Sequence, residues 1–142
     1  MRYLTESLWI ALGAALGANG RYWLGYACKA SVQEFPWPTL LINVIGSLLL
    51  GAFSAAAIER GWGQPARVFF AVGVCGGFTT FSTFSFEVID TFFRRSWKLA
   101  AVYAALSLVL CVAGCFAGGH FGRILFANKA PKANGVNPFD KG

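Results

Sequence analysis

The sequence of 142 residues is 56% hydrophobic and only 13% charged, and its mean hydropathy is +0.56. Because a soluble domain carries about 25% charged residues, this composition excludes an ordinary soluble domain and indicates an integral membrane protein. The formal net charge is +6. The basic residues lie at the ends of apolar stretches and near the C-terminus, so anionic lipid headgroups are a better counter-charge than nucleic acid.

Four long stretches that are almost free of charge follow one another along the chain. They are residues 7–28, interrupted only by Arg21, and the uncharged ranges 35–58, 68–86 and 99–119. A helix needs about 20 residues to cross the hydrocarbon core of a bilayer, and each stretch has about that length. We therefore predict an all-α integral membrane protein with four transmembrane helices per subunit.

The first predicted span covers residues 5–27. Its basic start and small residues also fit a cleaved signal peptide. However, the apolar run continues past Arg21 into Tyr22 and Trp23, and aromatic residues of this kind suit a membrane interface better than a cleavage site. A retained first span is the favoured interpretation.

The other predicted elements begin at recognisable positions. Pro38 suits the first turn of the second span, the third span starts near Ala66 after a turn rich in glycine, and the fourth starts near Trp97. The C-terminal residues are rich in Lys, Asn, Gly and Pro, a composition typical of disorder. We predict a four-helix transmembrane channel domain over residues 1–127 and a disordered polar tail over 128–142.

Short connections make successive spans antiparallel, which sorts the basic residues onto two sides of the membrane. The side of the N-terminus holds Arg2, Arg60, Arg67, Arg123, Lys129, Lys132 and Lys141, and the other side holds Arg21, Lys29, Arg94, Arg95 and Lys98. The positive-inside rule needs an excess of Lys and Arg on one side, and these two sets are nearly equal. Two interpretations stay open: orientation set by another feature, such as the first helix, or insertion in both orientations, which would allow an antiparallel dimer.

Polar side chains recur at one-turn spacing inside two predicted spans, so each set shares one helix face. The sets are Thr39, Asn43 and Ser47 in the second span, and Tyr103, Ser107 and Cys111 in the fourth. Polar groups inside a membrane are costly, although small ones also serve helix packing. For Asn43 we favour a function, because its amide has two donors and an acceptor to satisfy.

The third predicted span contains a break near Gly76-Gly77, because paired glycines continue a helix poorly. Such a break frees carbonyl groups that can hold a cation and creates a helix N-terminus that favours an anion; a simple packing kink is the alternative. Directly after it, aromatic residues alternate with hydroxyls, and Phe81 and Phe84 lie on adjacent parts of one face. The positive edge of a phenyl ring can attract an anion weakly, although phenylalanines more often face lipid or the core.

These motifs closely resemble those of the Fluc (CrcB) fluoride channels. The resemblance rests on Gly76-Gly77-Phe78-Thr79-Thr80-Phe81-Ser82-Thr83-Phe84, on Asn43-x-x-Gly46 in the second span and on Arg21-Tyr22 at the end of the first. It extends from the first span through the fourth and leaves out the tail. The long string is specific, whereas either short motif alone would be weak.

The resemblance implies a fluoride-selective ion channel that exports cytoplasmic fluoride passively down its electrochemical gradient and so confers fluoride resistance. It also implies an antiparallel, dual-topology homodimer with two pores along the interface between the subunits. The expected location is the plasma membrane of a prokaryote, which is the inner membrane in a Gram-negative cell. The expected partners are therefore the fluoride ion, a second copy of the chain and membrane lipid.

The same resemblance implies roles for individual residues. Phe81 and Phe84 would line the pore and meet fluoride edge-on, and Asn43 would present its amide to the ion. The polar track would continue through Thr39, Thr83, Tyr103 and Ser107, with Glu87 at its end. Arg21 would attract anions to a vestibule, and a structural sodium ion would bind the backbone carbonyls of Gly76 and Thr79 from each subunit. One departure is Cys111, which stands where relatives often have serine.

Two rival functions come from other classes. A small multidrug exporter has four spans but needs a carboxylate deep in the first, whereas here Glu6 lies near the start. A non-transporting assembly subunit would use its small residues for packing alone, and replacing Phe81 or Asn43 would then abolish no flux. An enzyme is not expected, because the sequence has a single histidine, His120, and no carboxylate pair or nucleophile–base motif within the spans.

Overall fold

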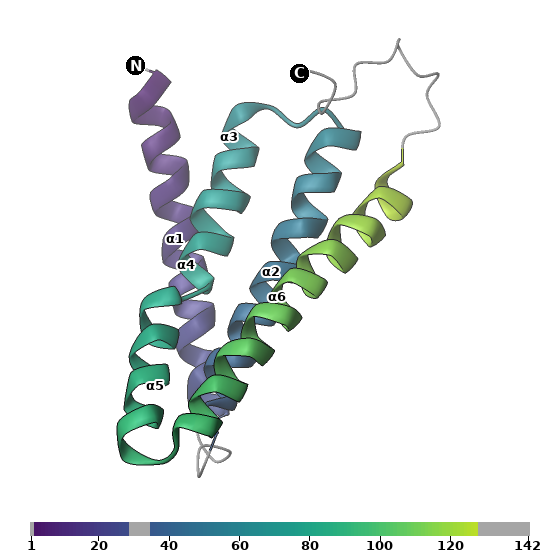
Figure 1. Ribbon diagram of the computed structural model, residues 1–142. Helices are drawn as coiled ribbons and strands as arrows, with labels where there is room; N and C mark the ends of the chain where they lie inside the picture. The colour runs from purple at the N-terminus through teal and green to yellow at the C-terminus, as the bar shows by residue number, and fades with distance from the viewer. Residues whose placement is uncertain (1, 29–34, 128–142) are drawn as a thin grey trace, which may run out of the picture.

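The computed structural model describes residues 2–28 and 35–127, and every regular element in those ranges is a helix (Figure 1). The elements are α1 (Arg2–Ala27), α2 (Trp37–Glu59), α3 (Gln64–Arg67), the π-helical segment η2 (Val68–Cys75), α4 (Gly76–Phe78), α5 (Phe81–Arg94) and α6 (Trp97–Phe126). Pro38 lies in the first turn of α2, and α6 begins at Trp97, as the sequence predicted. The predicted tail over 128–142 lies outside the described residues.

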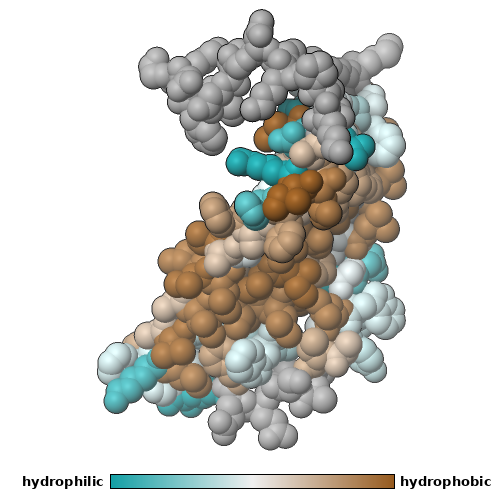
Figure 2. Space-filling view, turned by 90° about the vertical axis from the view of Figure 1, so that its right-hand side faces the viewer, coloured by the Kyte–Doolittle hydropathy of each residue, from teal (hydrophilic) through white to brown (hydrophobic). Residues whose placement is uncertain are grey.

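Three helices in the described ranges are long and apolar enough to cross a membrane. They are α2, the interrupted helix Gln64–Arg94 and α6. Figure 2 agrees with this, because one face of the molecule shows a broad apolar area across its middle and hydrophilic residues toward both ends. The helix α1 has sufficient length but is not among the three, so its predicted role as a further span stays a prediction.

The helices pack as two close pairs, α2 with α6 and α1 with the segment from η2 to α4 (Figure 1). Glycines permit this approach. A Cβ atom on Gly118 of α6 would lie 2.0 Å from the Leu48 carbonyl oxygen of α2, and one on Gly17 of α1 would lie 2.2 Å from the Val74 oxygen of η2. Both distances are far below van der Waals contact, so the backbones meet directly, as small residues allow in membrane helices.

The break in the third span lies slightly later than the sequence predicted. The chain stays helical through Gly76 and Gly77 and is interrupted at Thr79 and Thr80, whose backbones are extended. Gly77 serves packing instead, because a Cβ there would lie 2.7 Å from the Ala14 oxygen of α1. The π-helical turns of η2 just before it were not expected. The low helix propensity of the paired glycines thus indicated the correct region, but the helix is interrupted two residues later, at Thr79 and Thr80.

The second half of the interrupted helix begins at a side-chain cap. Thr80 precedes α5, and its Oγ1 accepts a hydrogen bond from the Thr83 N–H at 3.2 Å, as an N-cap residue does. At the other end of α5 the chain turns and enters α6, where Ser96 Oγ accepts from the Lys98 N–H at 3.2 Å. These two caps fix α5 between the break and α6.

Candidate ion pathway

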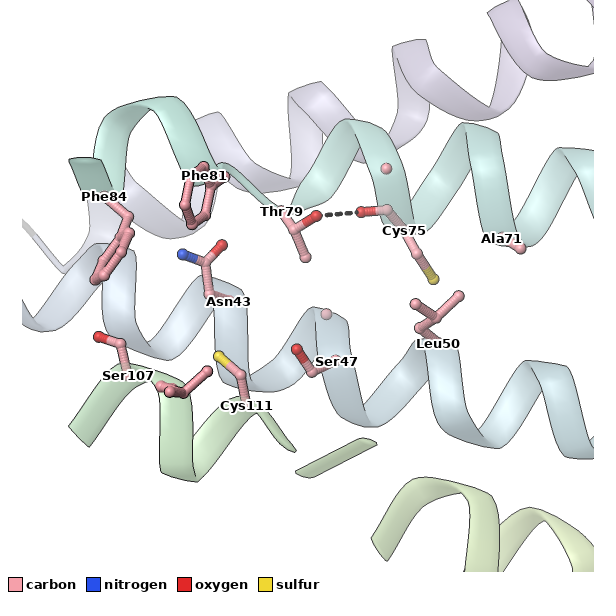
Figure 3. A pocket seen from close by; sticks show the side chains of 13 residues that line it. Asn43, Ser47, Leu50, Ala71, Cys75, Thr79, Phe81, Phe84, Ser107 and Cys111 are labelled. Carbon is pink, nitrogen blue, oxygen red and sulfur yellow. Dashed lines mark hydrogen bonds between the residues drawn. The ribbon is translucent and has the colours of Figure 1, made fainter. Parts of the chain in front are cut away.

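A partly open cavity of about 350 Å³ lies where α2, α6 and the interrupted helix face one another (Figure 3). Its lining consists of Asn43, Gly46, Ser47, Leu50, Ala71, Cys75, Gly76, Thr79, Phe81, Phe84, Ser107, Leu108 and Cys111. The break in the third span therefore forms one wall, and both polar stripes predicted from the sequence reach the cavity. The surface is otherwise mainly apolar, so the few polar groups decide what can bind.

Phe81 and Phe84 present their rings together on the first turns of α5. Their ring centroids are 5.6 Å apart with the planes inclined by 43°, and both rings lie on the side of the cavity near Asn43 (Figure 3). Phe84 also packs against Tyr103, at 5.2 Å between centroids. Phe81 is 79% exposed in the single subunit. A ring so exposed and so close to polar groups leaves its edge accessible from the cavity.

Asn43 is bound to the backbone of the break by two hydrogen bonds. Its Oδ1 accepts from the Thr80 N–H at 2.8 Å, and its Nδ2 donates to the Thr80 carbonyl at 3.2 Å. A carboxamide has two N–H donors, so one remains for a ligand in the cavity. The predicted contact of Asn43 with an anion is thus limited to a single N–H.

Ser107 provides an unpaired donor. The residue is only 5% exposed, and its Oγ has no hydrogen-bond partner within the described part of the chain. Buried hydroxyls are nearly always paired, and an exception calls for an explanation. Ser107 lines the cavity close to Phe84 and Cys111 (Figure 3), so its hydroxyl is a candidate donor to an anion, provided that the side chain turns the buried oxygen toward the cavity.

A second polar cluster adjoins the cavity beyond Phe84. Thr39 Oγ1 donates to Glu87 Oε1 at 2.8 Å, and the Tyr103 hydroxyl donates to Glu87 Oε2 at 2.7 Å. Tyr103 is fully buried and Thr39 nearly so. Both hydroxyl hydrogens are therefore directed to the carboxylate, which keeps a part-buried charge hydrogen-bonded. An anion at this end of the pathway would compete with Glu87 for these donors.

Two other predicted residues lie outside the cavity wall. Thr83 belongs to the capping network, where Thr80 Oγ1 donates to Thr83 Oγ1 at 2.9 Å. Arg21 lies near the C-terminal end of α1, half-buried. Thr80 holds this network together, although no role was predicted for it from the sequence. Its position just before a helix start, where threonine is a favoured cap, is the signal that could have revealed it.

The predicted sodium ligands are the backbone carbonyls of Gly76 and Thr79, and the break changes which hydrogen-bond donors are available to them. In a continuous helix the Thr80 N–H would donate to the Gly76 carbonyl, but here it donates to Asn43. The Thr83 N–H would likewise serve the Thr79 carbonyl, but it donates to Thr80 Oγ1. Both carbonyls have thus lost their usual helical donors. Hard cations prefer such oxygen ligands, so the residues present fit a cation site of this kind.

Comparison with known proteins identifies the family. Residues 8–119 match the family described as "CrcB-like protein, Camphor Resistance (CrcB)". The chain belongs to this family. The match includes α2, the break and most of α6, so it contains every residue that lines the cavity.

Individual relatives are similar over most of their length. A protein from Rhodospirillum rubrum is 42% identical over 126 residues, which cover 83% of this chain and 94% of the relative. One from Nitrobacter winogradskyi is 44% identical over 124 residues, which cover 85% and 98%. Both are named "Fluoride-specific ion channel FluC". The resemblance drawn from the sequence is confirmed, and the family is one of ion channels rather than enzymes. The bacterial relatives and the three apolar helices together indicate a multi-pass membrane protein.

Proposed function

We propose that this protein is a fluoride-selective channel through which cytoplasmic fluoride leaves the cell passively down its electrochemical gradient. The names of the relatives support fluoride as the ion. Within this chain, the proposal rests on the unpaired hydrogen-bond donors of residues around the cavity. They are the Ser107 hydroxyl and the remaining N–H of Asn43, beside Phe81 and Phe84. Fluoride is small and strongly hydrated, so a selective passage must replace its water with donors in a narrow space.

We further propose that the conducting unit is an antiparallel, dual-topology homodimer of four-span subunits with two pores along its interface. The partly open cavity and the 79% exposure of Phe81 support a second copy that would cover this surface. The nearly equal basic charge on the two sides supports insertion in both orientations. We propose that the protein lies in the plasma membrane of a bacterial cell, which is the inner membrane of a Gram-negative cell.

The polar track and the cation site complete the proposal. Thr39, Tyr103 and Glu87 would continue the pathway beyond Phe84, with Thr83 near the break and Arg21 attracting anions at a vestibule. The Gly76 and Thr79 carbonyls of one subunit supply only part of a coordination sphere, so those of the second copy would complete it. A sodium ion held there would supply a fixed positive charge at the subunit interface.

The pathway is tested by fluoride release from liposomes that contain purified variants. Phe81→Ile and Asn43→Ala are expected to slow release, because each removes a group that faces the cavity. Phe93→Ile is the matched control, since Phe93 is a similarly exposed phenylalanine on α5 that does not line the cavity. Equal release from all three folded variants would refute this pathway and favour the assembly-subunit interpretation.

A substitution at Gly76 tests separately whether a second copy packs against the cavity that this residue lines. A Cβ there would meet only the Ala71 oxygen, at 3.9 Å, and the backbone is ordinary α-helix. Gly76→Leu is therefore expected to leave the fold of a single subunit intact and to weaken pairing with a second copy. Chemical cross-linking in liposomes and circular dichroism would measure these two effects. Undiminished cross-linking of Gly76→Leu would place the interface elsewhere.

A further inference from the structure

The interruption of the third span depends on a side chain from another helix. At the break, Asn43 of α2 occupies both backbone hydrogen-bonding groups of Thr80, at 2.8 Å for the N–H and 3.2 Å for the carbonyl. This is the pattern that a neighbouring strand would form with an extended residue. Thr80 is only 7% exposed, so water cannot readily take over these bonds, and the carboxamide is the group that satisfies them.

The two hydrogen bonds between Asn43 and Thr80 directly affect the carbonyl of Gly76, one helical turn earlier. Without Asn43, the Thr80 N–H is free to donate to the Gly76 carbonyl and to continue the helix. With Asn43 in place, that donor is withdrawn and the Gly76 oxygen remains available. Gly76 lies on the wall of the same cavity and is exposed. Gly76 therefore borders a space from which an ion or a second subunit can approach.

We propose that Asn43 is a positioning residue for the cation site: by clamping Thr80 in an extended conformation, it keeps the Gly76 carbonyl available as a ligand for a hard monovalent cation. This inference rests on the proposed function, because it concerns the sodium site assigned there. It adds that one side chain serves both ions. The carboxamide holds the break with two of its groups and turns its remaining N–H toward the anion pathway.

The inference separates Asn43 from the other cavity residues. Ser107 and the two phenylalanines line the same cavity, but within the described part of the chain no side chain of these three is hydrogen-bonded to the backbone of the break. Loss of an outer partner that orients a metal ligand typically lowers metal affinity by about 10- to 100-fold. Replacing Asn43 is therefore expected to weaken cation binding as well as anion passage, whereas replacing Ser107 affects anion passage alone.

The carbonyl of Gly76 can be observed almost alone by isotope labelling. The sequence contains two Gly-Gly peptide bonds, Gly76-Gly77 and Gly118-Gly119. Protein grown with carbonyl-13C and 15N glycine therefore gives two carbonyl signals coupled to a labelled nitrogen in solid-state NMR of the protein in liposomes. Gly118 is buried between α6 and α2, so its signal is an internal control. Sodium chloride is titrated against a background of N-methylglucamine chloride.

In the wild type, sodium is expected to shift the Gly76 signal and not the Gly118 signal. Asn43→Leu is expected to require about 10- to 100-fold more sodium for the same shift. Asn43→Asp keeps an oxygen that can accept from the Thr80 N–H, so it should respond at a sodium concentration much closer to that of the wild type. Ser54→Ala, at an exposed position of α2 that does not line the cavity, should titrate like the wild type.

Several results would overturn the inference. They are an unchanged sodium titration in Asn43→Leu, a complete loss of response in folded Asn43→Asp, or a wild-type Gly76 signal that sodium does not move. Fluoride release is measured on the same preparations. Wild-type protein that releases no fluoride but shows a sodium response dependent on Asn43 would refute the proposed function and leave this inference standing.

Discussion

Replacing Ser107 with alanine is expected to change stability and fluoride release in opposite directions. The Ser107 hydroxyl is buried and has no partner within the described residues. Burying an unpaired hydroxyl costs about 1–3 kcal/mol, and alanine removes that cost while leaving a void of only one atom. We therefore expect the free energy of unfolding of Ser107→Ala to rise by up to about 1 kcal/mol.

The same Ser107→Ala substitution should slow fluoride release. A hydrogen bond to a charged group contributes about 1.5–3 kcal/mol, and each 1.4 kcal/mol of a barrier changes a rate about tenfold. If the Ser107 hydroxyl donates to fluoride as the ion passes, its loss slows release by about 10- to 100-fold. If the proposed function is correct, this hydroxyl therefore carries a cost in the empty channel and a benefit in the occupied one.

The assay compares thermal unfolding in detergent without fluoride and fluoride release from liposomes for the same variant. Ser54→Ala serves as the control, because Ser54 is exposed on α2 and does not line the cavity, so neither quantity should change. A destabilised Ser107→Ala protein with unchanged release would show that the hydroxyl serves the fold and does not contact fluoride.

Three further changes test separate parts of the account. Tyr103→Phe keeps the ring packing but removes the donor to Glu87 Oε2, so denaturant unfolding should show a loss of about 1–3 kcal/mol; wild-type stability would contradict this. In Gly118→Leu the new Cβ would lie 2.0 Å from the Leu48 oxygen, so size-exclusion chromatography should show loss of folded protein. A normal elution profile would be evidence against direct α2–α6 contact. Arg21→Gln should slow release in about 10 mM salt and have little effect in about 1 M salt, because the Debye length falls from about 30 Å to 3 Å; a salt-independent effect would exclude electrostatic attraction.

The helices could be predicted where the sequence alone sets their limits. The uncharged range 35–58 agrees closely with α2, which ends at Glu59, whereas α6 continues past the range 99–119 through His120 and Arg123 to Phe126. Pro38 and Trp97 lie at the helix starts in the structure. The span predicted over residues 5–27 is helical, but its Glu6, Asn19 and Arg21 make it more polar than the other three. The helix α1 could therefore be predicted from the sequence, whereas its role as a membrane span stays a prediction.

The break was predicted less well, because its position depends on contacts between distant residues. Low helix propensity cannot distinguish a glycine that ends a helix from one that lets another helix approach. Gly77 does the second, against Ala14 of α1. The interruption falls at Thr79 and Thr80, where Asn43 from α2 takes up the backbone groups of Thr80. Spacing placed Asn43 on a polar face but could not show which backbone it would meet.

The decisive experiment compares fluoride and chloride release from liposomes that contain the wild-type protein. The liposomes hold potassium fluoride or potassium chloride, valinomycin carries the compensating potassium, and ion-selective electrodes record the anion released. A fluoride-selective channel should give rapid fluoride release, with chloride release no faster than from protein-free liposomes. Equal release of both anions, or no fluoride release from folded protein, would contradict it.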